Sequence, residues 1–221
     1  AQMYAIYELA SGFLVWVALA VFAGGTAFRL AWLFAIGRKK DAAVFHYFSF
    51  YYALRSILHW IVPFASRNMR LHPVMTTVTF IFHLCLIITP IFAAAHAILI
   101  AESWGGRWWY LPDAASDIMT LAVILGCMFF LIRRIVKREV RYLTTPGDYV
   151  LLAIVAAPFV SGFWSYHQWS GFEIAGIIHM LSGELLLISI PFTRLFHMLL
   201  FPFTRGYSGS EFGGMRRARD W

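Results

Sequence analysis

The chain has 221 residues, of which 61% are hydrophobic and only 13% are charged. Its mean hydropathy of +0.70 excludes an ordinary soluble domain and indicates a helical membrane protein that crosses the bilayer several times. The formal net charge is +7. The basic residues stand between apolar runs, which is the orientation signal of a membrane protein and argues against a nucleic-acid partner.

The two cysteines, Cys85 and Cys127, lie deep inside apolar runs, so we expect no disulfide. No C-x-x-C-H sequence occurs, which excludes covalent c-type haem attachment. No pair of C-x-x-C motifs occurs either, so we expect no iron–sulfur cluster in this chain.

Five apolar runs predict an all-α integral membrane protein, a five-helix bundle forming one domain over residues 1–221. Each run approaches or exceeds the roughly 20 residues that a helix needs to cross a bilayer. The expected spans are about 12–36, 74–100, 118–134, 148–165 and 174–201. Basic clusters follow the first, third and fifth spans. The positive-inside rule therefore predicts a periplasmic N-terminus and a cytoplasmic C-terminus in a bacterial inner membrane.

The segment from about 41 to 69 mixes aromatic residues with scattered charge and is interrupted by Pro63. We expect an amphipathic helix in the cytoplasmic interface, with a shallow re-entrant segment as the alternative. His46, His59 and the nearby His72 are interpreted as interfacial histidines.

Four histidines lie inside apolar runs, where an imidazole costs free energy unless it has a partner. His179 and His197 are eighteen residues apart. In one regular helix that is five whole turns, so both rings would share a face about 27 Å apart along the axis. His83 and His96 are thirteen residues apart, about 20 Å of rise, with Pro90 between them. Kinks at Pro90 and Pro191 would have to absorb the difference of about 8 Å.

The second and fifth spans run in opposite directions, which sorts these four histidines into two pairs by depth. His83 would face His197 near the inner surface, and His96 would face His179 near the outer surface. Two neutral imidazoles on one low-spin iron make an electron-transfer haem without an open coordination position. We therefore expect two non-covalent bis-histidine haems b. The alternative is a haem-free anchor or transporter whose histidines serve in packing or proton movement.

Two charged residues of the fifth apolar run have open roles. Arg194 lies one turn before His197, where it would either pair with a haem propionate or extend to lipid phosphate. Glu184 lies in the middle of the run, where a carboxylate is costly. It would either relay protons or pair structurally with Ser182, Thr89 or Arg194, and the structural interpretation is slightly favoured.

The outer surface carries an aromatic loop from Trp104 to Asp117 and a short loop over 165–172. Aromatic walls with a few polar groups suit a quinone, whose oxidation must release protons. Arg107, Asp117 and His167 are the candidate residues for such a site. The alternative is an ordinary aromatic belt, because Trp and Tyr gather at any membrane surface.

Four sequence motifs carry a family resemblance over about half of the chain. They are IFH at 81–83, WYLPDAASD at 109–117, VRYLTTPGDYVLL at 140–152, and IIHMLSG with PFTRLFHMLLFPF within 177–203. In these motifs the chain resembles the cytochrome b (gamma) subunit of respiratory nitrate reductase and its relatives. The similarity is greatest to the b-type subunits of the transmembrane redox complexes of sulfate-reducing bacteria.

This resemblance implies five spans and two haems b, with His83, His96, His179 and His197 as the iron ligands. It implies an electron-transfer subunit of an oxidoreductase complex in anaerobic respiration. Electrons would pass between a periplasmic donor or the menaquinone pool and a cytoplasmic iron–sulfur subunit. A periplasmic multihaem cytochrome c and further membrane subunits are the other implied partners. The second expectation is an anchor subunit that oxidises quinol near the outer haem.

Overall fold

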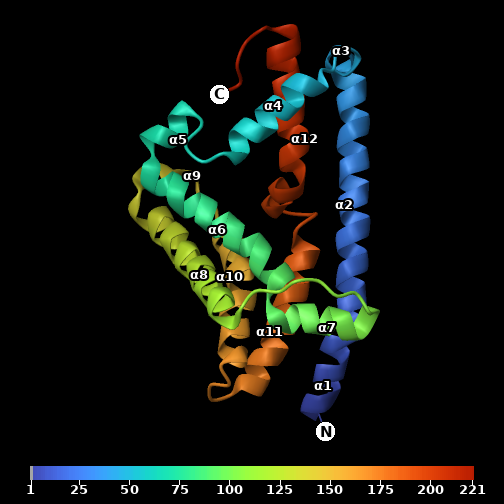
Figure 1. Ribbon diagram of the computed structural model, residues 1–221, viewed down its shortest axis with the longest axis vertical. Coiled ribbons are helices and arrows are strands. Elements are labelled where there is room, and N and C mark those ends of the chain that lie inside the picture. Colours follow the sequence, from blue (N-terminus) through green and yellow to red (C-terminus); the bar gives the residue numbers. More distant parts are fainter. Residues whose placement is uncertain (1) are drawn as a thin grey trace. The chain divides into compact units, whose positions relative to one another are not determined.

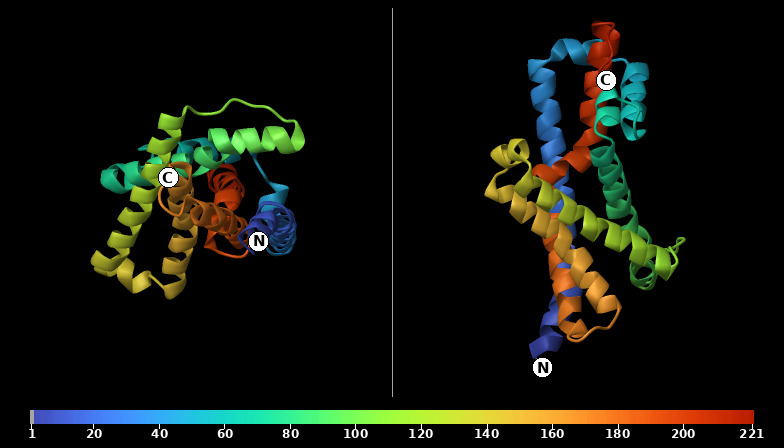
Figure 2. Two further views of the ribbon diagram at one scale, coloured as in Figure 1. Left: turned by 90° about the horizontal axis from the view of Figure 1, so that it is seen from below. Right: turned by 90° about the vertical axis from the view of Figure 1, so that its left-hand side faces the viewer.

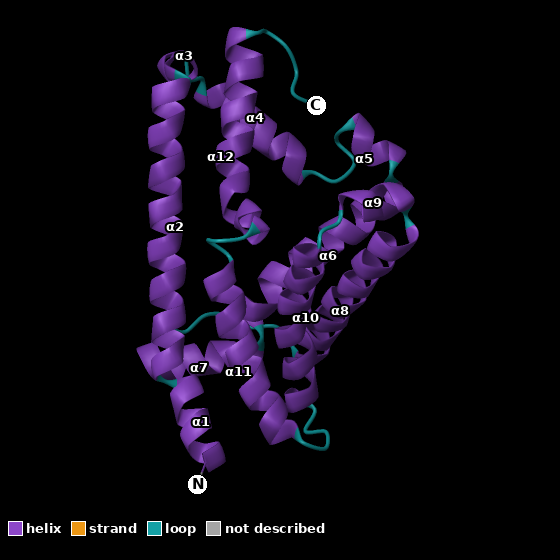
Figure 3. Ribbon diagram, turned by 180° about the vertical axis from the view of Figure 1, so that it is seen from behind, coloured by secondary structure: helices purple, strands orange, loops and turns teal. Residues whose placement is uncertain are grey.

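The computed structural model describes residues 2–221, and within this range every regular element is a helix (Figure 3). The chain divides into two compact units, which are described separately. The first unit contains the residues up to Phe13 and Val78–Leu186. The second unit contains Leu14–Thr77 and Leu187–Trp221.

Five helical segments are long and apolar enough to cross a membrane, as the sequence predicts, and the protein is therefore a multi-pass membrane protein. These segments are Met3–Lys40, Pro73–Trp104, Asp113–Val136, Pro146–Tyr166 and Phe172–Ser189. The first is longer at both ends than the expected 12–36. The residues before Gly12 form a helix, and the helix after it continues to Lys40. The fifth ends twelve residues earlier than the expected 201.

The first unit holds α1, most of α6, and the helices that follow α6 up to most of α11 (Figure 1). Their bounds are α1 Gln2–Ser11, α6 Pro73–Phe92, α7 Ala94–Trp104, α8 Asp113–Val136, α9 Arg138–Leu143, α10 Pro146–Tyr166 and α11 Phe172–Ser189. Helix α10 begins with a capping box between Thr145 and Asp148, and Pro146 fills its first turn, where a missing N–H costs nothing.

The second unit holds α2 and the remaining shorter elements. Their bounds are α2 Phe13–Lys40, α3 Ala42–His46, α4 Phe50–Ile61, α5 Arg67–Leu71, the 3₁₀ turn η1 Arg194–Phe196, α12 His197–Ser210 and the π-helical turn η2 Glu211–Met215. The segment expected to form one amphipathic helix over 41–69 is therefore three short helices separated by bends. Pro63 lies in the bend after α4, where it cannot continue the helix.

The second apolar run breaks at Ala93, whose backbone is extended, and α7 turns sharply away from α6 (Figure 1). The break leaves the last carbonyls of α6 without helical partners. Trp108 Nε1 donates to the Ile91 carbonyl at 3.0 Å, and the Leu111 amide donates to the Phe92 carbonyl at 2.8 Å. The loop after α7 runs back along that helix to reach α8, which brings both donors to the break (Figure 2).

The expected span over 174–201 is not one helix, so the five-turn argument for His179 and His197 is wrong. Helix α11 ends at Ser189, and His197 is the first residue of α12. The physical cause is Pro191, which has no N–H to continue the helical ladder. The Thr193 hydroxyl instead donates to the Ser189 carbonyl at 2.8 Å, which satisfies one of the carbonyls at the end of the helix.

Glycines set how closely α4 and α12 pack in the second unit (Figure 3). A Cβ added to Gly209 would lie 2.4 Å from the Ser56 Cβ and 2.6 Å from the Tyr52 carbonyl oxygen. A Cβ added to Gly213 would lie 2.3 Å from the Tyr52 ring. Only glycine therefore permits this approach, which fixes α4 against the C-terminal part of the chain.

Candidate functional site

His96 of α7 and His179 of α11 face each other within the first unit. Their Nε2 atoms are 3.4 Å apart, and the two rings are nearly parallel, with centroids 5.7 Å apart and planes inclined by 11°. Both side chains are half-buried. The structure therefore brings together one of the two histidine pairs that depth sorting predicts.

The other nitrogen of each ring is fixed by a backbone carbonyl. His96 Nδ1 donates to the Pro90 carbonyl at 2.8 Å, and His179 Nδ1 donates to the Pro158 carbonyl at 2.8 Å. Because a carbonyl only accepts, each Nδ1 carries the proton and each neutral ring presents a deprotonated Nε2. Two acceptor atoms then point at each other, which favours a cation between them.

The break at Ala93 explains why the Pro90 carbonyl is available. In an uninterrupted helix that oxygen would accept the N–H of residue 94, but Ala94 starts the separate helix α7. The released carbonyl accepts His96 Nδ1 instead. A proline-associated break therefore both redirects His96 and supplies its second hydrogen bond.

Gly162 makes room for the ring of His179. A Cβ at this position would lie 2.7 Å from His179 Nδ1 and 2.8 Å from its Cε1. Gly162 is one turn after Pro158 on α10, so one face of this helix supplies both the space and the acceptor.

These residues fit a haem iron. Metal–imidazole bonds are about 2.0 Å long, so two opposite ligands of one metal have their nitrogens about 4 Å apart. The observed 3.4 Å differs from this by about 0.6 Å. Two protein ligands are sufficient, because a porphyrin supplies the remaining donors, and carbonyl-bound Nδ1 atoms are the usual support of metal-binding histidines.

His83 and His197 share the same tautomer-fixing pattern but belong to different units. His83 Nδ1 donates to the Thr79 carbonyl in the first unit, and His197 Nδ1 donates to the Arg194 carbonyl in the second, both at 2.8 Å. Their pairing stays a prediction. Arg194 is the first residue of η1, the turn that ends just before His197.

Arg29 is a charged residue inside the first span to which the sequence analysis gave no role. Its Nη1 donates to the Pro191 carbonyl at 2.5 Å, and its guanidinium lies 4.5 Å from the centroid of the Phe196 ring. A charge in an apolar span is costly without partners, and this one is held at the chain break that precedes His197. The sequence does contain a signal for this residue, because an arginine among apolar residues of a span needs polar partners.

Gly25 lies one turn before Arg29 on α2 and contacts the same break, since an added Cβ would be 2.9 Å from the Pro191 ring. An added Cβ on Gly24 would meet nothing within 4 Å. Of the two glycines, only Gly25 therefore lets the segment that contains Pro191 pack closely against the backbone of α2.

Glu184 does not make the expected pairs with Ser182 or Thr89. The Ser182 hydroxyl donates to the His179 carbonyl, and Glu184 Oε1 is buried without a hydrogen-bond partner. The Thr89 hydroxyl is also buried without a partner. The cause for Ser182 is local, because a helical hydroxyl readily bonds the carbonyl one turn back.

Of the three quinone-site candidates, Asp117 and His167 lie together. His167 Nε2 and Asp117 Oδ1 are 3.2 Å apart, and each side chain is about one-third exposed. Phe163 and Trp169 flank the imidazole, with centroids 4.4 and 5.9 Å from it. Arg107 is exposed on the loop after α7, and within residues 2–221 it makes no hydrogen bond or ion pair to either residue.

Comparison with known proteins identifies a relative in Nitratidesulfovibrio vulgaris, whose name states no activity. It is 34% identical over 215 residues, which cover 94% of this chain and 93% of the relative. The chain belongs to the same family as this protein. No family model matches the sequence, and no solved structure matches it.

The space at Gly162 gives a testable consequence for the site. If the chain binds the two haems that the sequence predicts, Gly162→Ala should push the His179 ring off the Pro158 carbonyl and lower the haem content of the purified chain by about half. Overpacking of this kind usually costs about 1–3 kcal/mol, so the chain should still accumulate in the membrane.

Gly183→Ala on α11 is the matched control, because an added Cβ there meets nothing within 4 Å. Its haem content should equal that of the natural sequence. Unchanged haem content in Gly162→Ala would mean that His179 does not ligate iron in this position.

Proposed function

We propose that this protein is a dihaem b-type cytochrome, the membrane subunit of a multisubunit respiratory redox complex. Haem supplies a one-electron carrier, and two such carriers at different depths give electrons a path through the bilayer. The partners we propose are a cytoplasmic iron–sulfur subunit and, on the other side, a periplasmic multihaem cytochrome c or the menaquinone pool. Further membrane subunits complete the complex.

The facing pair of His96 and His179 carries the proposal. Each ring is fixed by a carbonyl at Nδ1, so both deprotonated Nε2 atoms are aimed into one gap. The motif resemblance in the sequence and the occurrence of a relative in a sulfate-reducing bacterium support the same function.

The proposed topology places the C-terminus in the cytoplasm and the N-terminus in the periplasm of a bacterial inner membrane. Helix α2 ends in Arg38, Lys39 and Lys40, and α8 ends with Arg133 and Arg134. Short basic segments of this kind are retained on the cytoplasmic side. His96 and His179 are then the outer ligands, and His83 and His197 the inner ones.

The surface of α4 supports an interfacial position for this helix. Phe50, Leu54, Leu58 and Ile61 recur at helical spacing and are 74%, 44%, 54% and 54% exposed. The opposite side, with Ala53 and Ser56, is buried against α12. An exposed apolar stripe on a helix that also has a packed side suits the boundary between lipid tails and headgroups.

Substitution of single histidines tests the ligand assignment. His96→Ala or His179→Ala should remove the outer haem, and His83→Ala or His197→Ala the inner one. Haem quantitation and reduced-minus-oxidised spectra of each purified variant would show a loss of about half the haem, because an imidazole ligand is not replaced by a methyl group.

His46→Ala serves as the matched control, since His46 lies in α3 outside the five apolar helices. It should retain both haems. Full haem content in any of the four ligand variants removes that residue from the assignment.

Arg29 should influence only the haem at His197. Removal of a positive charge near an iron disfavours the reduced form, so Arg29→Gln should lower the reduction potential of that haem. A tenfold change in the equilibrium corresponds to about 59 mV for one electron, and we expect a shift on the order of 50 mV in a potentiometric titration.

Arg38→Gln, at the end of the same helix, is the control and should leave both potentials within measurement error. A shift of equal size in both haems of Arg29→Gln would indicate a general structural effect and contradict a specific role for Arg29.

A second candidate function, quinol oxidation near the outer haem, is favoured by the pair of Asp117 and His167. A carboxylate hydrogen-bonded to an imidazole and flanked by aromatic rings can receive the protons that quinol releases. The proposed electron-transfer function does not require this site.

If the site is used, Asp117→Asn should slow the reduction of the outer haem by a quinol analogue about 100-fold, the usual contribution of a positioned general base. Reduction by a chemical donor should be unchanged. If no quinol analogue reduces the outer haem while a periplasmic cytochrome c does, the chain conducts electrons between two protein partners and has no quinol site.

A further inference from the structure

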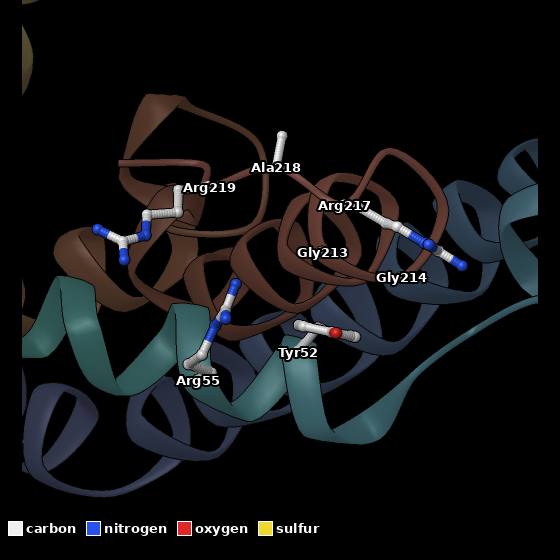
Figure 4. A pocket seen from close by; sticks show the side chains of 7 residues that line it. All are labelled: Tyr52, Arg55, Gly213, Gly214, Arg217, Ala218 and Arg219. Atoms are coloured by element: carbon white, nitrogen blue, oxygen red, sulfur yellow. The ribbon is translucent and has the colours of Figure 1, made fainter.

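The second unit contains a cavity of about 540 Å³ between α4 and the chain that follows α12 (Figure 4). Arginine and glycine dominate its lining, which includes Tyr52, Arg55, Gly213, Gly214, Arg217 and Arg219. Three arginines line this cavity and none of its lining residues is acidic, so its electrostatic potential favours an anion.

Arg55 is the positioned member of this set. Its guanidinium carbon is 4.8 Å from the centroid of the Tyr52 ring and 4.8 Å from that of the Trp221 ring. The side chain extends from α4 toward the C-terminal segment (Figure 4). Cation–π contacts with these two rings hold the guanidinium without using its N–H donors. Its Nε is buried and has no hydrogen-bond partner, which leaves a donor to be satisfied.

The nearest carboxylate is already engaged elsewhere. Asp220 accepts a hydrogen bond from the Ser56 hydroxyl and lies 3.9 Å from Arg205 Nη1, with 5% of its side chain exposed. Trp221 next to it stacks on His59, with centroids 4.1 Å apart. These contacts anchor the end of the segment on α4, and within residues 2–221 none of Arg55, Arg217 and Arg219 makes an ion pair.

The imidazole of His59 is affected by these arginines as well as by its burial and by Asp220. Burial lowers the pKa of its imidazole, and the charges of Arg70, Arg219 and Arg55 lower it further against the opposing effect of Asp220. A bound anion would counter these charges and raise the pKa of His59.

The backbone beside the cavity is unusual for a helix end. Residues 211–215 form a π-helical turn, and Arg217 has a left-handed φ of 52° although it is not glycine. Such departures cost free energy and gather at functional sites. Here the π-helical turn and the left-handed Arg217 place Arg217 and Arg219 at the rim of the cavity. Their side chains are exposed and point in different directions (Figure 4).

We propose that this cavity binds a phosphate-bearing anion, with Arg55 as the preorganised ligand and Arg217 and Arg219 as flexible ligands that close over it. Guanidinium groups match phosphate oxygens with paired hydrogen bonds. The site is separate from the histidines and does not depend on the presence of haem.

The phosphate could belong to a lipid headgroup or to a soluble molecule. The apolar stripe of α4, formed by Phe50, Leu54, Leu58 and Ile61, would face lipid, whereas Arg55 lies on another side of the same helix. The cavity is thus close enough to the interface for a headgroup and open to water. The test must therefore separate the two sources.

The experiment uses the full chain with two measurements. In neutral detergent, calorimetry at constant ionic strength measures the binding of inorganic pyrophosphate. In nanodiscs of phosphatidylcholine with and without phosphatidylglycerol, tryptic cleavage after Arg217 and Arg219 measures protection of the segment. Saturable pyrophosphate binding identifies a soluble anion, and protection only with phosphatidylglycerol identifies a headgroup. Either result supports the site.

R217Q/R219Q should weaken binding in the calorimetric arm at least about tenfold, or about 1.4 kcal/mol, because the variant loses the charge-assisted hydrogen bonds of both guanidinium groups. These side chains are exposed, so the variant should fold. R55K, which keeps the charge but loses the paired donors, should weaken binding in both arms. R141Q, which removes a charge from α9, is the control and should bind normally.

Two results would overturn the proposal. The first is no pyrophosphate binding together with equal protection in both kinds of nanodisc. The second is protection by a polyglutamate peptide but not by any phosphate group, which would make this surface a docking site for an acidic protein.

Discussion

Two imidazole nitrogens that face each other at 3.4 Å, each on a ring whose N–H is used elsewhere, need a proton or a metal ion between them. His96 and His179 are held in this arrangement because each ring has already used its N–H on a backbone carbonyl. The proposed function rests on this constraint. The break in the second span, the glycine on α10 and the loop that returns over α7 are all features that maintain it.

Prolines inside apolar helices make the arrangement possible. The chain after Pro90 breaks, and the freed carbonyl accepts His96. The Pro158 carbonyl accepts His179, and Gly162 one turn later leaves space for its ring. Pro191 ends α11 and presents its carbonyl to Arg29. In a membrane, carbonyls released from a helix must find donors within the protein, and here side chains supply them.

The sequence predicts the number of spans well, because runs of about 20 apolar residues have few alternatives to crossing a bilayer. It also identifies His96 and His179 as a pair, since chain direction and depth are readable from the order of apolar and basic segments. The continuity of helices is less predictable. The run from 174 to 201 is apolar throughout, yet the chain breaks at Pro191 and resumes at His197. Hydropathy does not distinguish a continuous span from two helices in the same apolar run.

The sequence also does not predict which partners single polar side chains find inside the protein. The sequence suggests that Glu184 pairs with Ser182, but that hydroxyl donates to a carbonyl of its own helix. Within residues 2–221, Oε1 of Glu184 is buried without a hydrogen-bond partner. Arg29 is easily taken for a tolerated charge near the end of a span. Its partners are carbonyls more than 160 residues away, which become acceptors only because the fifth run breaks.

The most direct test is the haem stoichiometry and low-temperature electron paramagnetic resonance spectrum of the purified natural chain. We expect two non-covalent haems per chain, both low-spin ferric with two imidazole ligands, because no coordination position is left open. A chain that purifies intact and folded without haem, or with a single haem, would contradict this expectation.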